Sequence, residues 1–178
     1  MSDVFTDLDD PGWSALFENI ERSWFRLETL QVYAVAYEDL GQAQFLSSGV
    51  VDDAPTSWRE MIRAHTDHGR RLQRVHVVEE PLTDYLRYEM AMYDLNHQAG
   101  EEISIIPVSS GEWPPGLPKH TDFWLFDDQD LWAMHYDHAG RFLAAARETS
   151  TERLDECRRW QAIALSQAVP LGDYALAR

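Results

Sequence analysis

The run RLQRVHVVE at positions 71–79 constrains the fold most, because polar and apolar residues alternate in it and three of its residues are valines. Such alternation is typical of a β-strand, in which successive side chains point to opposite faces of a sheet. The pattern assigns the side chains to two faces, with Leu72, Arg74, His76 and Val78 on one and Gln73, Val75 and Val77 on the other. Apolar residues then follow at helical spacing from Pro81 to Gly100, which predicts that a helix comes directly after the strand, with Pro81 in its first turn.

Three helices and one strand are expected before this run. The spacing of apolar residues predicts a helix at 13–21, and a short helix that Gly49 ends is expected at 39–47. A capping box of Ser57 with Glu60 opens a third helix. The segment 25–37 is rich in β-branched and aromatic residues, which favours a strand, although its leucines also fit a helix.

Strands and turns dominate the chain after Gly100. A strand is expected at 101–108, followed by a proline-rich loop that carries Trp113 over the surface. Two more strands are expected at 122–126 and 131–136, and a third follows a turn that contains Gly140. These three strands should form a meander.

The order of these elements predicts an α+β fold with a mostly antiparallel sheet, which ends in the three-strand meander and is covered by several helices. One of these is a C-terminal helix, opened by a capping box of Thr149 with Glu152. With 178 residues, of which 44% are apolar, the chain at 1–178 suits a single compact domain. The acidic residues 1–12 are expected to form a flexible N-terminal extension.

The charge of the chain bears on its partners and its location. A net charge of -16 argues against direct binding of nucleic acid, because affinity for phosphates comes largely from Lys and Arg. No apolar run approaches the roughly 20 residues that a membrane-spanning helix needs. The N-terminus is acidic where a secretory signal would be basic and then apolar, so we expect a cytoplasmic protein without a membrane partner.

Most acids of the stretch 122–140 are explained by turns, because Asp side chains bond nearby backbone amides. We therefore expect a structural role for four turn residues, Asp127, Asp128, Asp130 and Asp137. The stretch lacks the ligand pattern of a calcium loop. The histidines three positions apart, His65 with His68 and His135 with His138, have no evident third ligand, and a single cysteine excludes a multi-thiolate site. No metal and no cofactor are expected.

The residues best suited to chemistry lie on one strand face and on the helix after it. Arg74 and His76 share that face and Glu89 follows, so a cleft could combine an anion-binding guanidinium, a titratable imidazole and a carboxylate. An anionic ligand would bind at the basic run 69–74, and the residues expected to contact it are Arg71, Arg74, His76, Tyr85 and Arg87. The alternative is that Arg74 pairs with a neighbouring acid and that His76 is a partly buried, hydrogen-bonded ring.

A resemblance to a known family covers nearly the whole chain. It is carried by the segments FRLETLQVYAV, RRLQRVHVVEEPLTDYLRYE, DFWLFDD, MHYDHAGRF and RRWQAIALSQAVP. These segments resemble an actinobacterial family of unknown function whose members are often encoded beside helix-turn-helix regulators of the XRE type. The resemblance implies a context of transcriptional regulation or of a toxin and antitoxin pair. It supplies no activity and no catalytic residue to transfer.

Two classes of function fit the sequence. The first is a non-enzymatic regulatory or interaction protein, which binds a protein partner such as a helix-turn-helix regulator through its acidic surface and Trp113. The alternative is a small hydrolase or nuclease-like enzyme that acts on a phosphorylated substrate. In it, His76 would serve as base or nucleophile with Glu89 nearby, and Arg74 would hold the anion. The sequence leaves the oligomeric state open.

Overall fold

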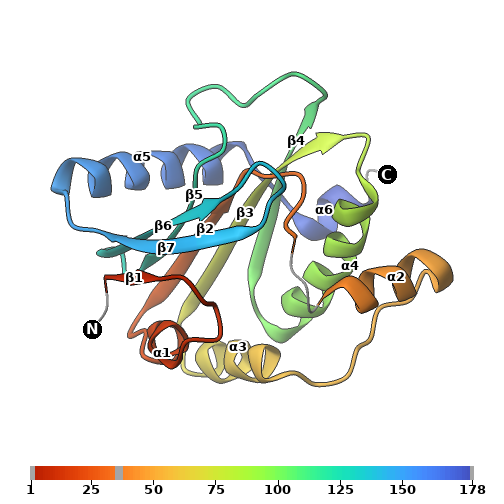
Figure 1. Cartoon of the computed structure of the whole chain (residues 1–178), viewed down its shortest axis with the longest axis horizontal. Helices are drawn as coiled ribbons and strands as arrows, with labels where there is room; N and C mark the ends of the chain where they lie inside the picture. Colours follow the sequence, from red (N-terminus) through yellow and green to blue (C-terminus); the bar gives the residue numbers. More distant parts are fainter. Residues whose placement is uncertain (1–2, 35–37, 177–178) are drawn as a thin grey trace.

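A mixed sheet of eight strands organises the chain, for which the computed structural model describes residues 3–34 and 38–176 (Figure 1). In spatial order the strands are β1 (Val4–Phe5), β7 (Phe142–Glu148), β6 (Asp130–Tyr136), β5 (Asp122–Phe126), β2 (Ser23–Glu28), β3 (Arg71–Glu80), β4 (Glu102–Ser109) and β8 (Val169–Pro170). The helices are α1 (Pro11–Glu18), α2 (Asp39–Ser48), α3 (Ser57–Asp67), α4 (Asp84–Ala99), α5 (Thr151–Gln167) and α6 (Leu171–Leu176).

The sheet combines a parallel centre with antiparallel flanks. β3 pairs in parallel with β2 on one side and with β4 on the other, whereas every other neighbouring pair is antiparallel. Parallel neighbours need a crossover, which α2 and α3 supply between β2 and β3 and α4 supplies between β3 and β4. The α+β class, the mostly antiparallel sheet and the meander β5–β6–β7 are therefore confirmed, and the parallel centre adds to them.

Helices cover both faces of the sheet (Figure 1). On one face, α1 and α3 pack over an aromatic cluster that includes Trp24, Trp124 and Trp132. Beside it, α4 and α6 pack over the ends of β3 and β4. On the other face, α5 packs over Val75 and Val77, so the two faces of β3 are those that the alternation predicted. In the described part of the chain, no helix is both long enough and apolar enough to cross a membrane.

Several element boundaries differ from the predicted ones. The N-caps of α3 and α5 are Thr56 and Ser150, and each lies one residue from the expected cap. The side chain of each accepts a hydrogen bond from the backbone N–H three residues later. The expectation that Pro81 lies in the first turn of α4 is wrong, because the Thr83 hydroxyl caps that helix. The strand expected at 25–37 ends at Glu28, and residues 35–37 lie outside the described residues.

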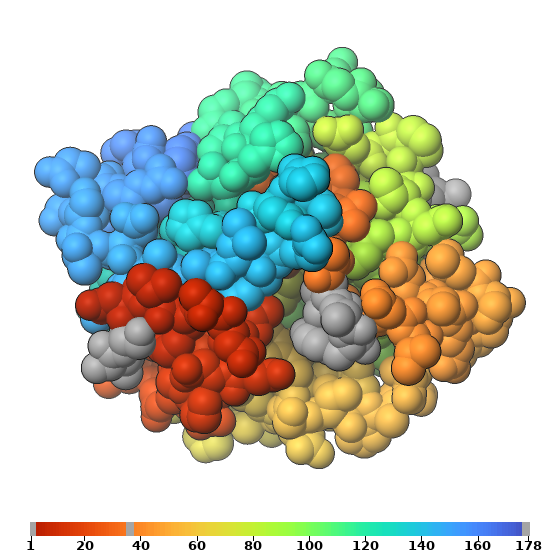
Figure 2. Space-filling model, in the orientation of Figure 1, coloured from red at the N-terminus to blue at the C-terminus, as the bar shows by residue number. Residues whose placement is uncertain are grey.

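Residues 3–12, where the sequence suggested a flexible extension, contain β1 and the start of α1. β1 pairs with β7, and Phe5 is buried against Trp13 and Trp132. In the space-filling view the red N-terminal residues lie against the blue meander (Figure 2). Apolar burial of Phe5 fixes this segment despite its acidic composition.

The acidic turns contact the protein itself. Asp127, in the left-handed region at φ 52°, accepts hydrogen bonds from the backbone N–H groups of Glu21, Arg22 and Ser23 at 2.7–2.9 Å. Asp130 pairs with Arg147, and Asp137 accepts bonds within its own turn. Partial burial would raise the pKa of Asp127, but the three N–H donors lower it below its usual range. The turn residue Asp127 therefore ties β5 to the start of β2.

We expect Asp127→Asn to lower the free energy of unfolding by about 1 to 3 kcal/mol, because it replaces charge-assisted hydrogen bonds with weaker ones. Asp128→Asn is the matched control, since Asp128 is an exposed neighbour that also has a positive φ. Urea melts measure both variants. A carboxylate with a lowered pKa stabilises the folded state above its unfolded pKa and loses this contribution as it becomes protonated. The difference between Asp127→Asn and the wild type should therefore shrink as the pH falls through the folded-state pKa of Asp127. Equal stability of the two variants at pH 7 would contradict this role.

Candidate functional site

A group of ionisable residues is buried on the face of the sheet that α4 covers, and we call this group the charge cluster. Its members are Arg26, Glu28, Arg74, His76, Glu89, Glu101 and Asp122, each at most 8% exposed. The pairing of the strands brings them together, because Arg26 is the partner of Arg74 and Glu28 is the partner of His76 across the parallel ladder. Register partners on neighbouring strands lie side by side on the same face of the sheet. The guanidinium groups of Arg26 and Arg74 are therefore neighbours inside the protein.

Glu28 bridges the two guanidinium groups. Its Oε1 accepts from Arg26 Nε at 2.8 Å, and its Oε2 accepts from Arg74 Nη1 at 2.9 Å. The hydroxyl of Tyr93, on α4, also donates to Oε2 at 2.5 Å. Burial alone would raise the pKa of Glu28, but Arg74 and Arg26 hold it well below its usual range. Glu28 is therefore an ionised carboxylate that accepts three hydrogen bonds.

Further acids and aromatic rings surround the guanidinium groups. Glu101 Oε1 accepts from Arg74 Nε at 3.1 Å, and Asp122 lies 3.7 Å from Arg26. Both guanidinium groups lie over the ring of Trp124, at 4.8 Å for Arg26 and 5.6 Å for Arg74. Cation–π contact adds to ion pairing at a buried guanidinium. Each arginine is thus compensated within the protein.

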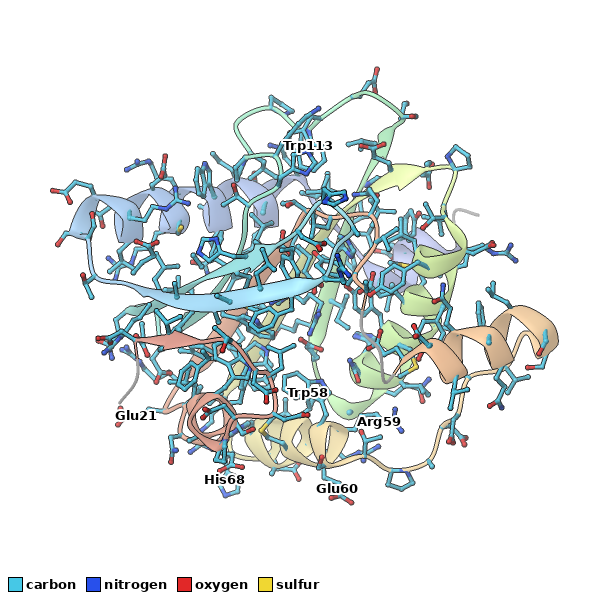
Figure 3. The ribbon with its side chains drawn as sticks, viewed as in Figure 1. Glu21, Trp58, Arg59, Glu60, His68 and Trp113 are labelled. Atoms are coloured by element: carbon cyan, nitrogen blue, oxygen red, sulfur yellow. The ribbon has the colours of Figure 1, made fainter. Side chains whose placement is uncertain are left out.

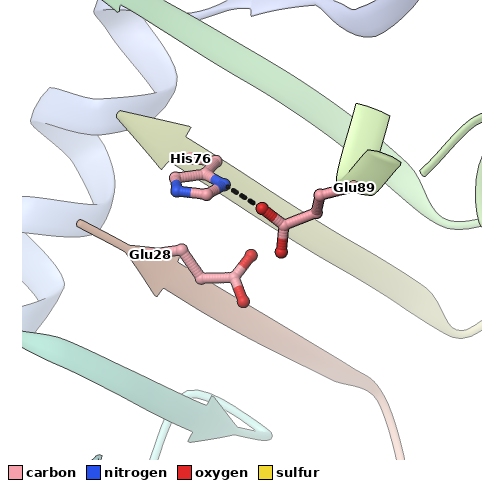
Figure 4. A group of neighbouring side chains, drawn as sticks. All are labelled: Glu28, His76 and Glu89. Carbon is pink, nitrogen blue, oxygen red and sulfur yellow. Dashed lines mark ion pairs between the residues drawn. The ribbon is translucent and has the colours of Figure 1, made fainter. Parts of the chain in front are cut away.

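His76 is fully buried between β3 and α4. Its Nε2 lies 2.7 Å from the Leu30 carbonyl oxygen, which can only accept, so Nε2 carries a proton. Its Nδ1 lies 3.0 Å from the Tyr93 hydroxyl and 3.4 Å from Glu89 Oε2 (Figure 4). Burial lowers the pKa of His76, and burial together with the nearby Glu28 raises the pKa of Glu89 well above its usual range. The pair therefore favours a neutral imidazole beside a protonated acid when no other charge is present.

The structure brings together four of the residues singled out from the sequence. Arg74, His76 and Glu89 belong to the charge cluster, and the Tyr85 hydroxyl donates to Glu89 at 3.2 Å. The other two lie outside the cluster, since Arg71 pairs with Glu102 and Arg87 with Asp84 at the exposed surface. Arg74 pairs with two acids, and His76 is a buried, hydrogen-bonded ring. A phosphate at Arg74 would lie beside the carboxylates of Glu28 and Glu101, which already pair with this guanidinium.

Sequence reasoning missed most of the acidic partners. Arg26 and Glu28 stand inside the apolar strand SWFRLE, and this pair of charges between buried residues is a signal that the sequence offered. Asp122 begins a predicted strand, and it accepts from the Thr29 backbone and from two hydroxyl groups. Glu101 follows a helix end and carries no local signal. Only the pairing of the strands places these acids beside Arg26 and Arg74.

A second feature is an open groove of about 540 Å³ beside the loop that carries Trp113. Apolar side chains of Val108, Pro114, Pro115 and Val169 line it, together with Glu112. Trp113 is half-buried rather than exposed, because its indole N–H bonds to the carbonyls of Leu117 and Pro118 and its ring packs on the α5 side of the sheet. Lys119 covers the ring at 5.3 Å. Hydrogen bonds and packing therefore fix Trp113 as part of the groove wall.

We expect Glu28→Gln to lower the free energy of unfolding by about 3 to 5 kcal/mol, because it leaves two buried guanidinium groups without their shared carboxylate. Glu102→Gln is the control, since it removes an exposed partner of Arg71 and should cost at most about 1 kcal/mol. Denaturant titration of both variants measures the difference. Equal losses would show that the bridge at Glu28 is dispensable.

Comparison with known proteins identifies the family but no function. No curated protein matches the chain. Residues 11–176, which contain every strand of the parallel centre and the whole charge cluster, match a family described as a domain of unknown function. The chain therefore belongs to the family of DUF6879 domains.

Proposed function

We propose that this protein is a non-enzymatic binding protein whose groove beside Trp113 takes an extended, basic segment of a protein partner. The observation that carries the proposal is the groove itself, which has apolar walls and one carboxylate, Glu112. Ligand sites are commonly apolar hollows with a few polar groups that fix orientation. The proline-rich wall has few rotamers to lose on binding, which lowers the entropic cost of association.

The edge of the sheet suits an extended segment. β8 pairs with β4 at Ser104 and Ile105, and no strand in the described part of the chain pairs with the remaining edge at 106–109. This stretch forms one side of the groove. Pro107 has no N–H, so a continuous ladder with a partner strand is blocked there. We therefore expect side-chain contacts with the groove walls to contribute more to binding of the partner segment than backbone hydrogen bonds to β4.

The charge of the protein favours a basic partner. The chain has 31 acidic and 15 basic residues, so it attracts cationic surfaces over distances of about a Debye length. At the groove end of the sheet, Glu79 is paired with Val108, and Glu112 stands in the groove wall. A Lys or Arg of the partner would therefore meet carboxylates beside an apolar surface. Given the gene context that the resemblance implies, a helix-turn-helix regulator is the first partner to test.

The alternative, hydrolysis of a phosphorylated substrate through Arg74 and His76, has less support. Both side chains are buried, and Arg74 already contacts two carboxylates. An anion would enter a region where acids outnumber guanidinium groups. The groove beside Trp113 lies on the opposite face of the sheet, so it gives no access to this pair.

Charge reversal at the groove tests the proposal. Glu112→Lys should slow association with the regulator and weaken the dependence of the association rate on salt, because it removes an attractive charge at the contact. Glu60→Lys makes the same change in net charge on α3, at the end of the molecule away from Trp113, and should have little effect (Figure 3). Surface plasmon resonance at several salt concentrations measures both, and overlapping peptides of the regulator identify the bound segment. Binding that both variants weaken equally, or no binding at micromolar concentration, would refute the groove as the contact.

Trp113→Ala should weaken the complex by about 1 to 3 kcal/mol, mainly through faster dissociation. Because Trp113 also packs on the core, this variant should lower the melting temperature as well. Melting curves recorded in parallel separate the two effects. An unchanged dissociation rate in a folded Trp113→Ala protein would exclude Trp113 as an anchor.

A further inference from the structure

We propose that Glu28, His76 and Glu89 form a binding site for a divalent first-row transition metal ion, with Zn²⁺ as the expected occupant. The site is independent of the groove and of partner binding. Each of the three residues offers a ligand atom, and these atoms all lie within 4.8 Å of one another. They come from β2, β3 and α4, and their polar groups converge (Figure 4).

The orientation of His76 is that of a metal ligand. Its Nε2–H donates to the Leu30 carbonyl, which fixes the ring and leaves the Nδ1 lone pair facing Glu89. Metal-binding histidines commonly hold their second nitrogen in this way. The Tyr93 hydroxyl has one proton, and it donates this proton to Glu28 at 2.5 Å. Nδ1 therefore receives no proton from Tyr93.

Glu89 supplies a second, independent observation. Its Oε2 is buried and has no hydrogen-bond partner among the described residues, although the residue is only 8% exposed. This oxygen faces His76 Nδ1 at 3.4 Å, and both atoms are acceptors when Glu89 is ionised. A Zn²⁺ ion with ligands at about 2.0–2.2 Å in tetrahedral geometry separates neighbouring ligand atoms by about 3.4 Å. The pair thus has the spacing of two ligands of one ion and is long for a hydrogen bond.

The charge balance of the interior also favours a dication. The charge cluster has four carboxylates and two guanidinium groups, so a fully ionised cluster with a neutral imidazole has an excess of two negative charges. Buried charge must be compensated, by protons or by a cation. A divalent ion restores neutrality without protonating any carboxylate. Arg26 and Arg74 hold the Glu28 carboxylate in place, as outer-shell partners of metal-bound carboxylates do.

The ligand set selects the class of metal. One imidazole nitrogen with two carboxylate oxygens suits first-row transition ions, whereas Ca²⁺ and Mg²⁺ prefer sites made of oxygen alone. Among ions of similar availability, Zn²⁺ binds such sites more tightly than Mn²⁺ or Fe²⁺.

The experiment titrates EDTA-treated full-length protein with Zn²⁺ by calorimetry and measures bound zinc after gel filtration by mass spectrometry. The wild type and Glu102→Gln, which changes an exposed acid, should each bind one ion per chain. Glu89→Gln removes a ligand atom but keeps the side-chain shape. It should lower the affinity by more than the roughly 10- to 100-fold that loss of an outer-shell partner costs.

A second measurement needs no variant. In the ¹⁵N spectrum of the wild-type histidine rings, Zn²⁺ should shift the Nδ1 resonance of His76 and leave its Nε2 protonated. Absence of stoichiometric zinc, equal affinity in Glu89→Gln, or an unshifted His76 signal would each overturn the proposal. In those cases His76 and Glu89 share a proton instead. None of these outcomes bears on partner binding, which is measured at the groove.

Discussion

The bridge from Glu28 to Arg26 and Arg74 is the interaction on which the centre of the sheet depends. Parallel pairing of β2 with β3 places the two guanidinium groups on neighbouring strands and the same face. Like charges on neighbouring strands inside a protein repel each other strongly. The Glu28 carboxylate accepts hydrogen bonds from both guanidinium groups, and its Oε2 also accepts one from Tyr93. Its negative charge offsets the repulsion and joins these residues in one network. The β2–β3 register and the position of α4 are thereby coupled.

Aromatic rings make this polar centre compatible with the surrounding core. Trp124 lies under both guanidinium groups, and Tyr93 lies under Arg74. Trp24, Trp124 and Phe17 extend the same face into the cluster covered by α1 and α3. The flat face of a ring accepts a guanidinium on one side and apolar atoms on the other, so these rings join the charge cluster to the apolar core.

The two candidate sites lie on opposite faces of the sheet. The charge cluster is enclosed by α4 and the aromatic cluster, whereas the groove lies on the α5 side beside the open edge of β4. Binding of a partner at the groove therefore involves different residues from the proposed metal site. β4 is the element that borders both, because Ile103 and Ile105 pack toward α4 while Ile106 packs toward α5.

Local sequence patterns determined much of the architecture. Alternation assigned the two faces of β3, helical spacing located α4, and Gly49 marked the end of α2. The acidic turns were identified by the preference of Asp for backbone amides. These features depend on neighbours within a few residues, which a sequence displays directly. The pattern also named Arg74, His76 and Glu89 as the chemically distinct residues of the chain.

What those residues do was decided by the tertiary structure. Glu28 and Glu101 are far from Arg74 in the sequence, and the pairing of β3 with β2 and β4 brings them to it. The pairing of β2 with β5 likewise brings Asp122 to Arg26. The pairing of β3 with β2 and β4 compensates the charge of Arg74 within the protein, because two acids already pair with its guanidinium group. The local burial of Phe5 and Trp113 likewise depended on partners distant in the chain. Periodicity reports which face a side chain takes, but only the packed chain determines which charge it meets there.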